Sequence, residues 1–185
     1  MTISLRRMIF GAVGGFIGGI AMELYWRLAA VVLGQDPRSV AKTEPTPESL
    51  RHLDSVSLIG RQYQDGESSQ AAAGRMIYET LTGQQPDAET KSLLEKLVIF
   101  GFSVGMSAAY SAVRDPGDDA DIAGGVLIGT GSWLGGDELA MPLAGFAEGP
   151  TSYPISLHLH SWAAHIAYGV VAALISQALI RLTDK

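Results

Sequence analysis

Seven ionisable side chains lie in stretches of this sequence that otherwise carry almost no charge. They comprise three acids, one arginine and three histidines, and we call them the intramembrane polar cluster: Glu23, Arg27, Asp137, Glu138, His158, His160 and His165. An ionised group at the centre of an apolar membrane helix costs roughly 2.5–3.5 kcal/mol. Such groups therefore pair with one another, bind a ligand or exchange a proton.

Spacing predicts which members of the cluster meet. Glu23 and Arg27 are four residues apart, so they share one face of a helix. At a rise of 1.5 Å per residue, Glu23 lies about 21 Å along its segment, and Asp137 lies about 22 Å along another segment that runs the same way. We expect an inward-facing network of Glu23, Arg27 and Asp137, with Glu138 turned towards the histidines. This pattern fits a structural network, and it also fits a proton, ion or ligand site.

The histidines do not have the spacing of a metal site on one helix. His158 and His160 point about 200° apart, and His158 and His165 share a face but lie about 10 Å apart along the axis. The chain has no cysteine, and we find no nucleotide-binding loop, no HExxH motif and no nucleophile elbow. We therefore expect no metal, no cofactor and no catalytic residue.

Four apolar segments must position these residues. Charged residues make up only 17% of the chain, whereas a soluble domain carries about a quarter. A membrane-spanning helix needs about 20 mostly apolar residues, and the segments of this kind are residues 8–34, 93–113, 122–147 and 155–182. The sequence predicts an all-α fold, a four-helix transmembrane bundle within a single polytopic membrane domain that covers residues 1–185.

Residues 35–92 form the one long polar stretch, and we interpret them as a small extramembrane helical insert between the first two spans. Its capping residues predict three helix starts and one helix end. The starts are at Thr46-Pro47, at Ser68 or Ser69 and at Asp87, and the end is at Gly83.

Glycines recur at intervals of four within the predicted spans. Small residues at this spacing let the backbones of membrane helices approach closely. The glycines that we expect to pack are Gly11, Gly15, Gly19, Gly101, Gly105, Gly125 and Gly129. Their partners are either other helices of the same bundle or the helices of another subunit.

The distribution of charge predicts the surroundings of the chain. A net charge of −6 provides no basic surface for nucleic acid, so the expected partners are the lipid bilayer and either other membrane subunits or a second copy. The basic residues that fall on one side of a four-span protein are Arg6, Arg7, Arg114, Arg181 and Lys185. Because short cytoplasmic segments are enriched in arginine and lysine, we expect both termini in the cytoplasm.

The second half of the chain resembles the YagU-like family of uncharacterised bacterial inner-membrane proteins. The matching residues are Ala109-Tyr110, Arg114-Asp115, Trp133-Leu134, Asp137-Glu138, Pro142, Gly145-Phe146, Pro150, Tyr153-Pro154, His158 and the stretch from Ala164 to Gly169. Family members often carry a His-Tyr pair where this chain has Ile99-Phe100. The resemblance implies a multi-pass protein of the inner membrane with four spans, and it implies no established activity.

These observations favour a non-enzymatic membrane subunit that acts by helix packing in a homo-oligomer or a larger membrane complex. A channel or transporter for protons or small solutes, built around the intramembrane polar cluster, is the alternative. A lipid-modifying enzyme ranks third, because the sequence shows no recognisable nucleophile.

The expected topology can be tested by labelling. Cysteines introduced separately at Ser4 and Ser68 should differ in whole cells treated with a membrane-impermeant thiol reagent. We expect Ser68→Cys to react and Ser4→Cys to stay protected, because the arginines hold the N-terminal end in the cytoplasm. The opposite labelling pattern would invert the topology.

Overall fold

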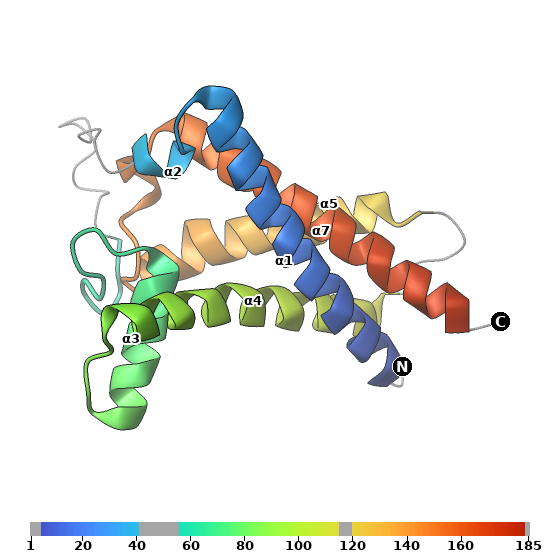
Figure 1. Cartoon of the computed structure of the whole chain (residues 1–185), viewed down its shortest axis with the longest axis horizontal. Coiled ribbons are helices and arrows are strands. Elements are labelled where there is room, and N and C mark those ends of the chain that lie inside the picture. Colours follow the sequence, from blue (N-terminus) through green and yellow to red (C-terminus); the bar gives the residue numbers. More distant parts are fainter. Residues whose placement is uncertain (1–4, 41–55, 115–119, 184–185) are drawn as a thin grey trace. The chain divides into compact units, whose positions relative to one another are not determined.

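The computed structural model describes residues 5–40, 56–114 and 120–183, and every regular element in these ranges is helical (Figure 1). Three helices are long and apolar enough to cross a membrane: α1 (Leu5–Leu33), α4 (Ala88–Val113) and α7 (Ile155–Thr183). At 1.5 Å per residue, each is about 39–44 Å long, which exceeds the roughly 30 Å hydrocarbon core of a bilayer. These three helices indicate a membrane protein.

The segment predicted as the third span is helical but is not one long α-helix. It consists of α5 (Ile122–Ser132), the wider π-helical η2 (Trp133–Ala140) and the short α6 (Met141–Leu143). The change of pitch follows from the sequence, because Gly135 and Gly136 are weak helix formers and Pro142 lacks a backbone N–H. The all-α prediction is confirmed with three long apolar helices, and the four-helix transmembrane bundle stays a prediction.

The chain divides into two compact units. Unit 1 comprises Met1–Pro37, Phe100–Trp133 and His158–Lys185, and so contains α1, the second half of α4, α5 and most of α7. Unit 2 comprises Arg38–Ile99 and Leu134–Leu157. It contains α3 (Ser69–Thr82), the first half of α4, almost all of η2, α6 and η3 (Pro150–Ser152), whereas the short α2 (Pro37–Val40) begins at the end of unit 1.

Capping residues set the boundaries of the helices in unit 2. The Ser68 hydroxyl accepts a hydrogen bond from the N–H of Ala71 at 3.1 Å, so Ser68 is the N-cap of α3. Gly83 ends α3 in the left-handed conformation, with φ of +68°. The Asp87 carboxylate accepts a hydrogen bond from the Thr90 N–H at 2.7 Å at the start of α4. These three predicted boundaries are confirmed, and the one at Thr46-Pro47 lies outside the described residues.

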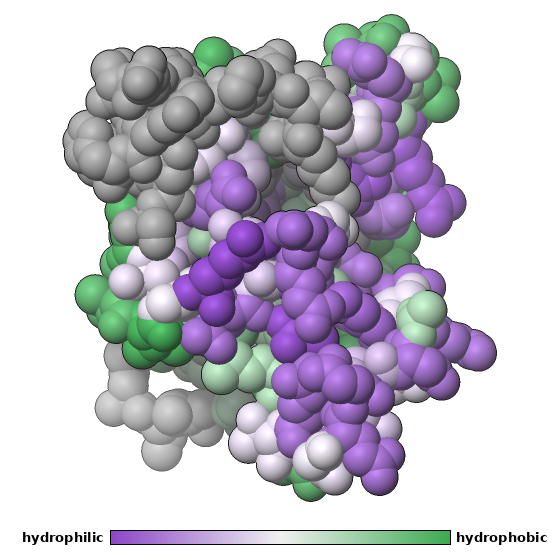
Figure 2. Space-filling model, turned by 90° about the vertical axis from the view of Figure 1, so that its left-hand side faces the viewer, coloured by the Kyte–Doolittle hydropathy of each residue, from purple (hydrophilic) through white to green (hydrophobic). Residues whose placement is uncertain are grey.

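A buried carboxylate joins α3 to the beginning of α4 inside unit 2. The Glu67 side chain is only 1% exposed, and it lies 3.0 Å from Arg75 Nε and 2.6 Å from Lys91 Nζ. Arg75 also binds Glu79 at 3.0 Å. Burial raises the pKa of Glu67, but the hydrogen bonds from Arg75 and Lys91 outweigh burial and lower the pKa to about 2. Figure 2 shows hydrophilic residues gathered on the side of the molecule where α3 lies.

A second contact in unit 2 attaches the loop before α3 to the end of α6. The Leu58 N–H donates to the Leu143 carbonyl at 2.9 Å, and the Gln62 N–H donates to the Gly145 carbonyl at 2.8 Å. Gly145 has a φ of +73°, and a Cβ there would lie 2.8 Å from the Ser57 hydroxyl oxygen. Only glycine fits this close crossing of two backbones without strain.

In unit 1, α1 packs against two helices through two separate glycine faces. Towards α4, a Cβ on Gly11 would lie 2.7 Å from Ser111 Cβ, and one on Gly15 would lie 2.8 Å from Ser107 Cβ. Towards α7, a Cβ on Gly18 would lie 2.6 Å from the Tyr168 carbonyl oxygen. These distances leave no room for a side chain, so both helices contact the α1 backbone itself.

The packing of α5 on α7 also depends on glycines that leave no room for a side chain. A Cβ on Gly125 would lie 2.5 Å from Val170 Cα, and one on Gly129 would lie 2.8 Å from the His165 carbonyl carbon. Between these contacts Tyr168, which is 2% exposed, donates a hydrogen bond to the Ser103 carbonyl at 2.8 Å. Small residues thus predominate in the interior of unit 1, together with Tyr168 and a few larger buried side chains such as Ile128 and Ile180.

Replacing Gly15 by alanine should destabilise the protein, because the added methyl group meets Ser107 and the α4 backbone. We expect Gly15→Ala to lower the free energy of unfolding in detergent by about 1–3 kcal/mol. Gly131→Ala is the matched control, because no described atom lies within 4 Å of a Cβ at that glycine. The control should be neutral or stabilising by about 0.4–1 kcal/mol, and equal losses in both variants would contradict the packing of α1 on α4.

Candidate functional site

Glu23 and Arg27 form the ion pair that their spacing predicts, but the pair faces outwards. Arg27 Nε lies 3.4 Å from Glu23 Oε1, and the side chains are 72% exposed for Arg27 and 46% exposed for Glu23. The structure therefore places the pair on the outer face of α1 instead of the interior. Neighbouring Trp26 is buried and occupies the inward position.

The three histidines of α7 lie in different surroundings. His160 Nδ1 is 2.8 Å from the Tyr25 hydroxyl oxygen, and its ring also approaches that of Trp26, with centroids 6.5 Å apart. His165 Nδ1 is 2.8 Å from the Ser161 carbonyl of its own helix. His158 is half-buried near the start of α7. Within the described ranges, no three His, Cys, Asp or Glu side chains come together in a way that could hold a metal ion.

Asp137 and Glu138 lie in η2 and belong to unit 2, whereas Glu23 and Arg27 belong to unit 1. Both acids are half-buried. Burial raises the pKa of Tyr153 in the following loop, and the negative charges of Glu148, Glu138 and Asp137 add to the rise. The proposed pairing of Asp137 with Arg27 stays a prediction.

The predicted packing glycines separate into two groups. Gly11, Gly15, Gly125 and Gly129 lie against neighbouring helices, and Gly19 faces the Phe100 ring, 3.1 Å from the position of a Cβ. Gly101 and Gly105 are exposed on α4, and no described atom lies within 4 Å of a Cβ at either position. The two glycines of α4 are therefore open on the outer surface, unlike Gly11, Gly15 and Gly19 of α1 and Gly125 and Gly129 of α5.

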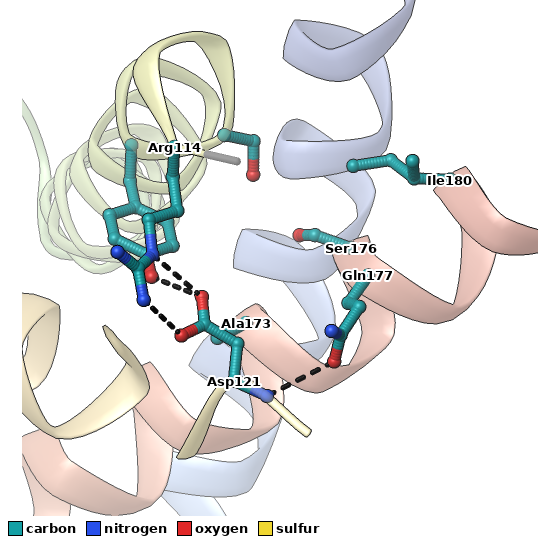
Figure 3. A pocket seen from close by; sticks show the side chains of 8 residues that line it. Arg114, Asp121, Ala173, Ser176, Gln177 and Ile180 are labelled. Carbon is teal, nitrogen blue, oxygen red and sulfur yellow. Dashed lines mark hydrogen bonds and ion pairs between the residues drawn. The ribbon is translucent and has the colours of Figure 1, made fainter. Parts of the chain in front are cut away.

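A clamp that sequence reasoning missed lies at the end of unit 1 where α4 ends and α5 begins. Its centre is Asp121, which is 5% exposed. The Asp121 carboxylate accepts hydrogen bonds from the Tyr110 hydroxyl, from the Gly124 N–H at 3.2 Å and from Arg114 Nη2 at 3.0 Å. Its own N–H donates to Gln177 Oε1 at 3.1 Å (Figure 3). One aspartate thus binds α4, the start of α5 and α7.

The charge of Arg114 determines the ionisation of this clamp. Burial raises the pKa of Asp121, but the hydrogen bonds from Arg114 and Tyr110 outweigh burial, so the net shift is downwards. Asp121 is therefore a carboxylate at neutral pH, and the Arg114 side chain beside it is 46% exposed. The acceptor positions of the carboxylate are occupied by protein donors, which suits a structural clamp better than acid–base catalysis.

A small pocket opens beside the clamp. It is lined by residues of α4 and α7 together with Asp121, and Figure 3 shows Ser176, Gln177 and Ile180 on the α7 side. The space in which the centre of a water molecule can move is about 10 Å³, so the pocket accommodates about one water molecule. It is far smaller than the several hundred Å³ that a small-molecule ligand fills.

No protein-family model, curated protein or solved structure matches this chain.

Removing the charge at the centre of the clamp should destabilise unit 1. We expect Asp121→Asn to lower the free energy of unfolding by about 1.5–3 kcal/mol at pH 7, because it breaks a buried charged hydrogen bond. Asp65→Asn is the control, because the Asp65 side chain is 96% exposed in its pair with Arg61. That control should change stability by less than about 1 kcal/mol.

The effect should also depend on pH with a defined sign. Because the pKa of Asp121 is lower in the folded protein than in the unfolded chain, its ionised form contributes stability above a pH of about 4, and this contribution is lost as the pH falls further. The difference in thermal stability between the parent and Asp121→Asn should therefore shrink under acidic conditions. A difference that stays constant down to pH 3 would show that the charge of Asp121 is not responsible.

Proposed function

We propose that this protein is a non-enzymatic integral membrane subunit that assembles with a second copy of itself through α4. The observation that carries the proposal is a stripe of exposed small and apolar residues at intervals of four on the unit 1 part of that helix. Its members, which we call the α4 stripe, are Gly101, Gly105, Ala109 and Val113.

The α4 stripe differs from the other glycine faces of unit 1 in lacking a partner helix among the described residues. The glycines of α1 are covered by α4 and α7, and Gly125 and Gly129 of α5 are covered by α7, whereas Gly131 near the end of α5 is open but has no second open glycine four residues away within unit 1. On an exposed membrane helix, small residues four apart form a shallow groove in which the backbone of another helix can lie. Association through the same patch on two identical subunits forms a closed dimer with twofold symmetry.

The interior of unit 1 supports a packing role over transport. Several of its buried polar groups bind one another, as Tyr168 does with Ser103 and Asp121 with Arg114. The pocket beside the clamp accommodates about one water molecule, so it is too small for a solute. These contacts account for Tyr168 and Asp121 as components of the helix packing, whereas the buried Ser132 Oγ and Trp133 Nε1 have no hydrogen-bond partner among the described residues.

The resemblance to the YagU-like family belongs to the same proposal. It supports a location in the bacterial inner membrane with four spans, and the arginines near both ends of the chain support cytoplasmic termini. The fourth span would be formed by the helical segment that contains α5 and η2.

Disulfide cross-linking tests the proposed dimer directly, because the natural chain contains no cysteine. Gly105→Cys and Ala109→Cys, oxidised mildly in native membranes, should each give a species of twice the monomer mass on a non-reducing gel. Leu127→Cys is the control, because Leu127 is 71% exposed on α5 and lies outside the stripe. Adding Gly101→Leu should suppress cross-linking at Ala109→Cys, since a leucine side chain blocks close approach. Equal cross-linking at all three cysteines would reject α4 as the contact.

A further inference from the structure

All three tryptophans of the chain lie at one end of unit 1. Trp26 of α1 and His160 of α7 have ring centroids 6.5 Å apart, and Trp133 and Trp162 have centroids 6.3 Å apart. Since His160 and Trp162 are two residues apart on α7, the three helix segments bring their tryptophans to the same level. We call Trp26, Trp133 and Trp162, together with Tyr25, the aromatic end.

Arginines gather at the opposite end of the same unit. Arg6 Nη1 donates to the Thr183 carbonyl at 3.3 Å, and Arg7 Nη1 donates to the Arg114 carbonyl at 3.3 Å. Arg181 lies in the last turn of α7. Arg6, Arg7, Arg114 and Arg181 form what we call the arginine end.

The distance between the two ends is the same on two helices. Arg7 and Trp26 are nineteen positions apart on α1, and Trp162 and Arg181 are nineteen positions apart on α7. Either interval corresponds to about 28 Å of helix, close to the roughly 30 Å hydrocarbon core of a bilayer. The two helices run antiparallel and meet at both ends, through Tyr25 with His160 and Arg6 with Thr183. The two intervals therefore cover the same layer of unit 1, bounded by the aromatic end and the arginine end, and we call this layer the slab.

Between the ends the outer surface is mostly apolar, with Glu23 as the exception on α1, and the serines lie inside. Along α1 the exposed apolar positions in this slab are occupied by Ile9, Val13, Phe16, Ile20 and Leu24, which are 41–53% exposed. The serines of α4 and α7 at the same levels are buried: Ser103, Ser107, Ser111 and Ser176. A water-facing bundle has the opposite arrangement, so the outer face suits hydrocarbon.

We infer that lipid acyl chains cover the outer face of α1 between the aromatic end and the arginine end, and that these ends mark the two bilayer interfaces. Tryptophan and tyrosine are enriched at the level of the lipid headgroups, where the ring is in an apolar layer and the N–H or O–H reaches polar groups. This inference rests on the proposed function only in placing the chain in a membrane.

The same placement explains the outward direction of the Glu23–Arg27 pair. Arg27 follows Trp26 directly, so its guanidinium lies at the aromatic interface and can reach the headgroups along its own stem. Glu23 lies one turn deeper and is bound to Arg27. The pair therefore avoids the cost of a charge at mid-membrane without facing the interior of the bundle.

Quenching of tryptophan fluorescence by spin-labelled lipids measures these depths. The full-length chain would be reconstituted in phosphatidylcholine vesicles that carry a nitroxide at either carbon 5 or carbon 12 of the acyl chain. One variant keeps Trp162 alone, with Trp26→Phe and Trp133→Phe. A second replaces all three tryptophans by phenylalanine and adds Phe16→Trp, because Phe16 is half exposed and lies midway between Arg7 and Trp26.

We expect the shallow label to quench Trp162 about twofold more strongly than the deep label does, and Phe16→Trp to show the reverse order. Stronger quenching of Trp162 by the deep label would overturn the inference. So would the absence of quenching of Phe16→Trp by either label, because protein would then cover this face. Cross-linking through the α4 stripe is measured separately, so the dimer and the bilayer placement can fail independently.

Discussion

The close approach of α1 to its two neighbours is the constraint on which unit 1 depends. Gly11 and Gly15 lie against α4, and Gly18 lies against α7, at distances that exclude a single methyl group. In lipid, helices gain little from burying apolar surface, so van der Waals contact between backbones and a few interhelical hydrogen bonds must hold them together. The buried serines and Tyr168 supply those hydrogen bonds only because the glycines bring the helices close enough.

With the helices held at this distance, the polar groups at both ends of unit 1 can reach partners on neighbouring helices. The arginines near the chain termini bind carbonyl groups at the ends of neighbouring helices, and Asp121 binds α4 and α7 at the start of α5. The rings of Tyr25, Trp26 and His160 meet at the opposite end. Charged and aromatic groups are therefore concentrated at the ends, and the part between them is held by small residues.

Local signals in the sequence predicted the helices and several of their ends, because caps depend on neighbouring residues. The caps at Ser68, Gly83 and Asp87 form hydrogen bonds with residues three or four positions away. Glu23 and Arg27 are likewise four positions apart. The direction of that pair was not predictable, because α1 is apolar on every side and the glycine periodicity that predicts its packing face ends at Gly19, before the pair. Asp121 was missed for another reason: it follows an acidic turn in the sequence, and its partners Tyr110 and Gln177 are distant along the chain. Likewise, Gly101 and Gly105 have the same spacing as Gly11 and Gly15, and only the helices opposite distinguish an open face from a packed one.

The buried charges of unit 2 have a consequence for the behaviour of the protein in salt. Glu67 and Glu79 balance Arg75 and Lys91, so the group is neutral as a whole, and the Glu67 and Arg75 side chains are nearly inaccessible. At physiological ionic strength mobile ions screen exposed charges over about 8 Å, but they screen buried pairs much less. The exposed Arg61–Asp65 pair of the neighbouring loop weakens as salt is added, whereas the attachment of α3 to α4 persists. Unit 2 thus contains one electrostatic contact that responds to the surrounding ionic composition and another, a few residues away, that does not.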